Sequence, residues 1–272
     1  PLKNTTIGDE ILNVKDLTIN FYDKGFFTRR KLRISAVKKI SFTLNRGESL
    51  GIIGENGSGK SSESQALLGL IPFDGDIVIN DKKVSPNRRL KRRNSAKNVQ
   101  IIFQNAESSL NPIKKVKDTL EEALKYSEKA KSKNIEAEII TLLKSVDLDE
   151  SFLSRLPSEM SGGEKQRLCI ARALCFQPDI LICDEAVSSL DIPVKKKVLR
   201  LLFELKNNYG LSVIFISHNI DLIRYFCDRL LFFHDGEIKE DSNTQSFMKN
   251  PQNQHSKDLL TSYRKLELNT GK

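Results

Sequence analysis

The stretch GENGSGKSS, residues 54–62, most limits what this chain can fold into. It follows an apolar run, precedes a segment with helical periodicity, and fits the pattern G-x4-G-K-[ST]. Glycines let successive backbone N–H groups converge on phosphate oxygens, and the start of the next helix adds the positive end of its dipole. An exposed lysine on an ordinary glycine turn is the structural alternative. The strand–loop–helix context favours a phosphate-binding loop in an α/β protein.

The side chains of this segment have different predicted roles. Lys60 is expected to reach the β and γ phosphates, and the Ser61 hydroxyl to bind Mg²⁺. Glu63 follows in the first helical turn, where an acid suits the helix dipole and can point away from the nucleotide. The predicted nucleotide-binding residues of this segment are Asn56, Gly57, Ser58, Gly59, Lys60, Ser61 and Ser62.

Strand and helix patterns alternate over most of the chain, which predicts a mostly parallel sheet with ligands at the carboxyl ends of its strands. Strand patterns occur at residues 17–21, 36–44, 47–53, 98–104, 179–183 and 211–217, and hairpins at 74–84 and 229–240. Helical patterns occur at residues 60–70, 163–174, 193–208 and 220–227. Charged amphipathic helices replace the alternation between residues 105 and 160, so this segment is predicted to be a helical insertion.

Two further segments carry the residue types of a nucleotide-hydrolysis site. In DILICDEAVSSLD, a buried strand delivers Asp184, which can hold Mg²⁺, and Glu185, which can polarise the attacking water. In MSGGEKQRLCIARAL, Ser161, Gly162 and Gly163 begin a second helix whose first N–H groups suit a phosphate. Two such helix starts are redundant in one site, which favours a head-to-tail dimer in which each chain closes the other's nucleotide.

Charge and cysteine content restrict the partners. The net charge of +9 raises nucleic acid or anionic lipid as partners, but the basic stretches 26–33 and 87–97 carry no groove-reading motif. A solvated or membrane-adjacent face is the preferred interpretation. The four cysteines show no C-x-x-C spacing and are read as reduced core thiols of a cytoplasmic protein. No stretch is apolar enough to predict a membrane span or a secretion signal.

Over residues 11–265 the chain resembles the ATP-binding subunits of ABC transporters. Residues 54–62 look like the family's Walker A motif, MSGGE like its LSGGQ signature, ILICDE like Walker B, and SSLD (188–191) like the D-loop. Gln104 in IIFQN looks like the Q-loop glutamine, and His218 in FISHN like the switch histidine. The adenine-stacking aromatic of the family is assigned to Phe21, with Tyr22 as the alternative.

The resemblance implies an ATPase with ATP and Mg²⁺ as ligands. The implied catalytic residues are Glu185, His218 and Gln104, and the implied metal ligands are Ser61, Gln104 and Asp184. The implied fold is an ABC-type P-loop α/β domain with an antiparallel β subdomain. One domain, residues 1–272, would consist of a core from 1–104 and 161–240, a helical subdomain at 105–160 and a C-terminal extension at 241–272.

Within the family, the chain is most similar to the peptide and nickel uptake group. FQNAESSLNP resembles its FQDP-x-x-SLNP segment, and NPQNQHSKDLL its C-terminal NP-x-HPYT-x-x-L element. An F-type subunit of a peptide importer is the preferred interpretation, with a nickel or metal-chelate importer as the alternative. No cysteine follows Cys227, so no iron–sulfur cluster is expected.

Several positions depart from the group's pattern. Met160 and Glu164 replace the outer residues of the signature, and Ser62 replaces a threonine while keeping the hydroxyl. Asn105-Ala106 stands in place of Asp-Pro, and Ser256 in place of a proline. These departures leave hydrolysis intact as an expectation, because the Ser-Gly-Gly core and both acidic residues are kept.

The resemblance also implies an assembly. The expected partners are a second ABC ATPase subunit (identical or related), two transmembrane permease subunits and, indirectly, an extracytoplasmic substrate-binding protein, with no nucleic acid. The expected location is the cytoplasmic face of the plasma membrane. Two other classes compete with a transport motor. A nucleic-acid- or ribosome-associated ATPase is suggested by the charge alone, and a binding-only cassette would need a decayed catalytic position.

Overall fold

The computed structural model describes residues 7–23, 32–55, 57–85, 98–127 and 134–270. Asn56 and most of the basic stretches 26–33 and 87–97 lie outside these described residues. The chain forms two compact units, the first from residues 1–95 and 214–272 and the second from residues 96–213. In the described part of the chain, no helix combines the length and the apolar character that crossing a membrane requires.

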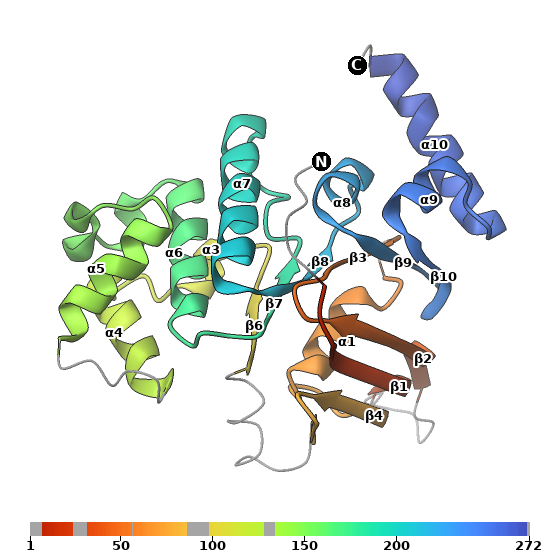
Figure 1. Cartoon of the computed structure of the whole chain (residues 1–272), viewed down its shortest axis with the longest axis horizontal. Coiled ribbons are helices and arrows are strands. Elements are labelled where there is room, and N and C mark those ends of the chain that lie inside the picture. The colour runs from red at the N-terminus through yellow and green to blue at the C-terminus, as the bar shows by residue number, and fades with distance from the viewer. Residues whose placement is uncertain (1–6, 24–31, 56, 86–97, 128–133, 271–272) are drawn as a thin grey trace. The chain divides into compact units, whose positions relative to one another are not determined.

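The first unit contains an antiparallel sheet with the strand order β2-β1-β4-β5 (Figure 1). Its strands are β1 (Glu10–Asp23), β2 (Leu32–Asn45), β4 (Asp74–Ile79) and β5 (Lys82–Lys83). The alternation that predicted a half-buried β1 is confirmed at Leu17 and Ile19, which are buried, but not at Phe21, which is exposed beyond an irregularity in the pairing between Ile19 and Asn20. The predicted hairpin is also confirmed: Asn80 and Asp81 both have positive φ, which suits a tight turn between β4 and β5.

A second group of strands in the first unit contains β3 (Ser49–Gly54), whose six residues are all buried. β3 pairs in parallel with β9 (Arg229–His234), which pairs antiparallel with β10 (Glu237–Asn243). The helices of this unit are α1 (Lys60–Leu67), α8 (Ile220–Phe226), α9 (Thr244–Lys249) and α10 (Gln254–Thr270). The parallel pair and the β9–β10 hairpin agree with the predicted strand pattern.

Helix α1 ends three residues earlier than its periodicity predicts. Gly69 has a φ of 64°, which is a left-handed conformation that glycine adopts at little cost. The N–H of Gly69 donates to the Ala66 carbonyl at 2.8 Å, and that of Leu70 to the Gln65 carbonyl at 2.9 Å. These two bonds satisfy the last carbonyls of the helix, so the apolar pattern continues into a turn.

The second unit pairs β6 (Val99–Ile102) in parallel with β7 (Ile180–Asp184), and most of the rest of this unit is helical (Figure 1). The segment predicted as a helical insertion does form helices. They are α3 (Ala106–Ser109), α4 (Val116–Ser127), α5 (Ile135–Ser145), η1 (Glu150–Ser154) and η2 (Pro157–Glu159). Helices α6 (Gly162–Leu174) and α7 (Ile192–Tyr209) follow, and β8 (Ser212–Ile216) carries the chain back towards the first unit.

The four cysteines are free and buried, which confirms them as core thiols. Burial raises the pKa of Cys169 to about 11 and that of Cys183 to about 12. Because the thiolate is the reactive form, these side chains act as small apolar groups at neutral pH.

Within the first unit, the C-terminal extension is held to strands β9 and β10 by polar and ring contacts. The Glu240 carboxylate accepts hydrogen bonds from the backbone N–H groups of Gln252 (3.1 Å) and Asn253 (3.0 Å), just ahead of α10. The rings of His234 and His255 stack with their centroids 4.1 Å apart. Helix α10 is therefore anchored to β9 and β10 by its first turn.

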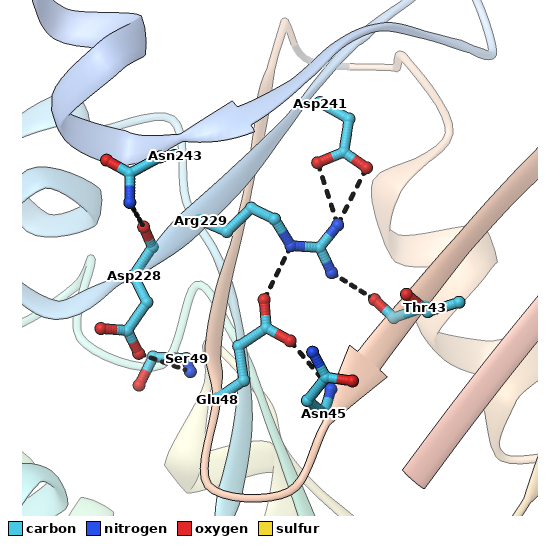
Figure 2. A network of polar contacts seen from close by, with 8 residues as sticks. All are labelled: Thr43, Asn45, Glu48, Ser49, Asp228, Arg229, Asp241 and Asn243. Carbon is cyan, nitrogen blue, oxygen red and sulfur yellow. Dashed lines mark hydrogen bonds and ion pairs between the residues drawn. The ribbon is translucent and has the colours of Figure 1, made fainter. Parts of the chain in front are cut away.

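Arg229, the first residue of β9, joins the two groups of strands in the first unit (Figure 2). Its Nε lies 2.7 Å from Glu48 Oε1, and its Nη1 donates to both carboxylate oxygens of Asp241, at 2.9 and 2.8 Å. Its Nη2 donates to the Thr43 carbonyl in β2. Glu48 is only 4% exposed and also accepts the backbone N–H of Asn45 at 2.8 Å. We call this group of residues the Arg229 clamp.

Replacing Arg229 with Met should lower the free energy of unfolding by about 3 kcal/mol, because Glu48 would be left as a buried charge without its cation. Chemical denaturation of the purified chain measures this. The matched control is Lys83→Met, which breaks an ion pair with Asp76 whose side chains are 67% and 51% exposed, and should cost at most about 1 kcal/mol. Equal losses in the two variants would contradict a structural role for the clamp.

Candidate nucleotide-hydrolysis site

The predicted phosphate-binding loop leaves the buried end of β3 at Gly54, and its backbone passes close to other strands. A Cβ on Gly54 would lie 2.2 Å from the Phe233 carbonyl oxygen. A Cβ on Gly59 would lie 2.3 Å from the Ala36 carbonyl oxygen, and its φ of 103° is left-handed. Only glycine fits at either position, so packing against β9 and β2 fixes the course of the loop.

Lys60 lies within the loop and does not extend into solvent. The residue is 7% exposed, and its Nζ donates to the carbonyls of Gly54 at 2.8 Å and Glu55 at 2.6 Å and to the Ser58 hydroxyl at 3.3 Å. The structure thus places an ammonium group over a turn of backbone that opens into a helix N-terminus. This arrangement suits an anion, because both the cation and the helix dipole attract negative charge.

The other predicted residues of the loop differ in exposure. Gly57 and Ser61 are exposed, Ser62 is half-buried and Ser58 is buried. Glu63 is fully buried in the first turn of α1. The sequence predicted only that an acid here would suit the helix dipole, and did not predict this burial. Ser61, the residue predicted to bind Mg²⁺, is thus an exposed residue directly after Lys60.

His218 is an exposed residue between β8 and α8, in the first unit. The N–H of the preceding residue, Ser217, donates to the Ile52 carbonyl of β3 at 3.1 Å. Asn219 follows and caps α8 by accepting the N–H groups of Asp221 (2.9 Å) and Leu222 (3.3 Å). His218 therefore lies between two hydrogen-bonded neighbours. Ser217 is bonded to Ile52, two residues before Gly54, and Asn219 caps α8.

Phe21 is 43% exposed and lies on β1, opposite Ile34 of β2. Two residues further along β2, Ala36 adjoins Gly59 of the phosphate loop. The side chain of Tyr22, the alternative, lies outside the described residues. Phe21 thus offers an exposed aromatic face on the strand pair that borders the loop.

The predicted acidic residues lie in the second unit. All five residues of β7 are buried, and the strand ends at Asp184, which is 9% exposed. Glu185 follows with a φ of 53°, a left-handed conformation that costs a non-glycine residue roughly 1 kcal/mol or more. The Ser188 hydroxyl donates to Glu185 Oε2, and the Ser188 N–H donates to the Glu185 carbonyl at 2.9 Å. Ser188 therefore holds the carboxylate predicted to polarise water, a role that sequence reasoning missed although the two residues are three apart.

Gln104 is exposed and follows β6 in the second unit. Its carbonyl accepts the hydroxyl of Ser189 at 3.3 Å. The side chain of the next residue, Asn105, caps α3 by accepting the N–H groups of Glu107 (3.0 Å) and Ser108 (3.2 Å). The predicted Q-loop and D-loop segments are thus in direct contact within this unit.

The signature residues begin α6 and are held by a capping box. The Glu164 carboxylate accepts both the backbone N–H of Ser161 at 2.7 Å and its hydroxyl at 2.8 Å. The backbone hydrogen bond from Ser161 lowers the pKa of Glu164, although partial burial acts in the opposite direction. A Cβ on Gly163 would lie 2.4 Å from Val194 Cγ1, so packing against α7 alone requires this glycine. Gly162 is exposed beside Ser161.

Glu164→Gln should reduce the free energy of unfolding by about 1 kcal/mol at pH 7, since it removes the charged member of the capping box. Because the folded pKa is lowered, the carboxylate stabilises the fold above the unfolded pKa of about 4.3 and loses this effect as pH falls through the folded value. Urea titrations of both proteins between pH 7 and pH 4 measure the difference. If the difference in the free energy of unfolding between the two proteins does not shrink as the pH approaches 4, the ionised Glu164 carboxylate is not what stabilises the capping box.

The predicted residues therefore form two groups, each placed by its own unit. Those in the first unit are Phe21, Gly57, Ser58, Gly59, Lys60, Ser61, Ser62 and His218. Those in the second unit are Gln104, Ser161, Gly162, Gly163, Asp184 and Glu185.

Comparison with known proteins gives a consistent result. Residues 37–188 match the ABC transporter family. The chain is 34% identical over 264 residues to the glutathione import ATP-binding protein GsiA of Escherichia coli K12, covering 96% of this chain but 42% of that protein. It is 36% identical over 231 residues to the nickel import ATP-binding protein NikE of Shigella dysenteriae, covering 85% of this chain and 86% of NikE. The chain thus spans less than half the length of the glutathione import protein.

A solved structure is also similar, the dimeric post-hydrolysis state of the ATP-binding cassette MJ0796 bound to ADP and Pi. The TM-score is 0.75 at 25% identity, over 86% of this chain and 99% of that one. The arrangement of strands and helices is therefore that of an ATP-binding cassette.

Proposed function

The chain belongs to the ABC transporter family, and from this premise we propose that it is the ATP-hydrolysing subunit of a membrane importer for peptides. Two relatives, a glutathione import protein and a nickel import protein, support a peptide cargo as the first candidate and a metal-chelate cargo as the second. The single observation that carries an ATPase function is the position of Lys60, held over the turn between β3 and α1.

In the proposed reaction, the backbone of residues 57–62 and the Lys60 ammonium bind the phosphates of ATP, and Phe21 stacks on the adenine. Ser61, Gln104 and Asp184 are the proposed Mg²⁺ ligands, and they supply the oxygen donors that this ion prefers. Bound Mg²⁺ would neutralise charge on the phosphates. Glu185 takes the proton from the attacking water, and His218 contacts the terminal phosphate.

The proposed assembly contains a second ABC ATPase subunit, whose nucleotide is completed by Ser161, Gly162 and Gly163 of this chain. A dimeric structural neighbour supports this arrangement. The remaining proposed partners are two transmembrane permease subunits and, through them, an extracytoplasmic substrate-binding protein. The chain would be a peripheral protein on the cytoplasmic face, with residues 105–160 as its helical subdomain and 241–272 as its C-terminal extension.

The test is reconstitution, in lipid vesicles, of the chain with the permease and ATPase subunits that co-purify with it, together with a substrate-binding protein. We expect Mg-ATP-dependent uptake of short peptides, and hydrolysis that rises when loaded binding protein is added. Uptake of a nickel chelate without peptide uptake would favour the second cargo. Hydrolysis that neither cargo stimulates, together with salt-sensitive RNA binding, would overturn the importer proposal.

A further inference from the structure

Three residues on one face of α6 hold the short helix α3 in the second unit. Lys165 Nζ lies 2.7 Å from Glu107 Oε1, and Arg172 Nη1 donates to the Ser109 carbonyl at 2.5 Å. Between them, Cys169 Sγ lies 3.8 Å from the Ala106 carbonyl. The positions i, i+4 and i+7 form one stripe of a helix, so these contacts of α3 are all made with a single face of α6.

Helix α3 depends on these contacts for its position. It has four residues, far fewer than an isolated helix needs to be stable in water. Asn105 caps its first turn and also accepts the hydroxyls of Ser108 and Ser109 at its carbonyl, whereas the polar contacts to the rest of the unit named above go to α6. The Lys165 side chain is 13% exposed, whereas that of Glu107 is 76% exposed, so the ammonium is held against the protein and the carboxylate reaches in from solvent. The hydrogen bond and the charge of Lys165 lower the pKa of Glu107.

Both ends of this helix pair lead to predicted site residues. Gln104 directly precedes the cap of α3, and its carbonyl is bonded to Ser189, the neighbour of the serine that holds Glu185. At the other end, the Lys165 N–H donates to the Ser161 carbonyl at 2.9 Å, one turn into the signature helix. A continuous series of contacts therefore runs from Glu185 to Ser161 inside one unit.

We propose that Lys165 and Arg172 are positioning residues that make the Gln104 segment and the signature helix move as one body. This inference rests on the proposed function, in which Glu185 and Gln104 act on the chain's own nucleotide and Ser161 on that of the second subunit. Lys165 and Arg172 then couple the two nucleotide sites, because a displacement of Gln104 is carried to Ser161 through α3 and α6. Neither residue is among the predicted catalytic or nucleotide-binding residues.

The central experiment is charge reversal in the assembled transporter. Lys165→Glu should lower the Hill coefficient of ATP hydrolysis from about 2 towards 1 and reduce turnover roughly threefold to tenfold, while the affinity of the chain for ATP stays within about twofold. Combining it with Glu107→Lys restores the ion pair with reversed polarity and should recover the Hill coefficient. This recovery separates coupling from a general loss of stability.

Hydrogen exchange of the amides of Glu107 and Ser108 supplies a readout that needs no nucleotide. Exchange should be faster in Lys165→Glu and return to the wild-type rate in the double variant. If Lys165→Glu does not fold, Arg172→Lys replaces it, since it shortens the reach to the Ser109 carbonyl and keeps the charge; the same fall in the Hill coefficient is expected. The matched control is Glu204→Lys, which breaks the exposed pair between Arg200 and Glu204 on α7 and should leave the Hill coefficient unchanged.

Each result has a defined meaning. A wild-type complex that hydrolyses no ATP overturns the proposed function. A wild-type complex that hydrolyses ATP cooperatively, with an unchanged Hill coefficient in Lys165→Glu, overturns only the coupling role. Failure of the double variant to recover, when it is folded and binds ATP, also overturns that role.

Discussion

Glu185→Gln is expected to reduce ATP turnover by the assembled transporter by about 100-fold to 10,000-fold, which is the range of a lost general base. Glutamine has nearly the same shape and can still accept the hydrogen bond from Ser188, but it cannot take a proton from water. The strained backbone of Glu185, with its φ of 53°, should survive the change because the contacts that impose it remain.

The measurement combines steady-state hydrolysis with ATP binding. The variant should bind ATP at least as tightly as the wild type, and its complex should accumulate in the ATP-bound, closed form. Ser188→Ala is the companion variant: it removes one hydrogen bond to the Glu185 carboxylate and keeps the carboxylate itself, and should reduce turnover by about tenfold or less, as expected for one hydrogen bond. Unchanged turnover in Glu185→Gln would reject this residue as the base.

Lys60→Ala is expected to weaken ATP binding by the purified chain by about 100-fold. The ammonium is the cation that the loop itself holds, and a charge-assisted hydrogen bond to a phosphate contributes about 1.5–3 kcal/mol, or up to roughly two factors of ten. Isothermal titration with Mg-ATP gives the affinity. Lys82→Ala, which removes an exposed lysine of β5, controls for net charge and should bind normally.

The unfolding midpoint of Lys60→Ala must be measured beside the affinity, because Lys60 also bonds the Gly54 and Glu55 carbonyls. An affinity loss with a near-normal midpoint would place the effect on phosphate recognition. Normal ATP affinity in a folded Lys60→Ala chain would refute the proposed role of the loop.

The sequence predicts most elements of this fold because their signals are local. The apolar run before Gly54 and the periodicity after Lys60 define β3 and α1 without any distant contact. The end of α1 is the instructive error, since Leu70 continues the apolar pattern and only the left-handed backbone of Gly69 stops the helix. Conformation at a single glycine outweighs periodicity there.

The site residues were accessible to sequence reasoning for the same reason, since each motif is a short continuous segment. The contacts that support the motifs were not accessible. Lys165 and Glu107 are 58 positions apart, and Arg229 and Glu48 are 181 apart. Nothing in the local pattern distinguishes these charged residues from others on solvated helix faces, because which charges meet is decided only when the elements pack.

The Arg229 clamp has a consequence for how a nucleotide is chosen. Arg229 ties the end of β2 to the start of β9, and the Lys38 N–H of β2 donates at 2.7 Å to the carbonyl of Gly236, in the turn between β9 and β10. Ala36, two residues before Lys38 on β2, lies against the phosphate loop at Gly59. The strand pair that carries Phe21 is therefore held at a fixed distance from Lys60. A ligand that reaches both would need a base, ribose and phosphate chain whose length matches that distance.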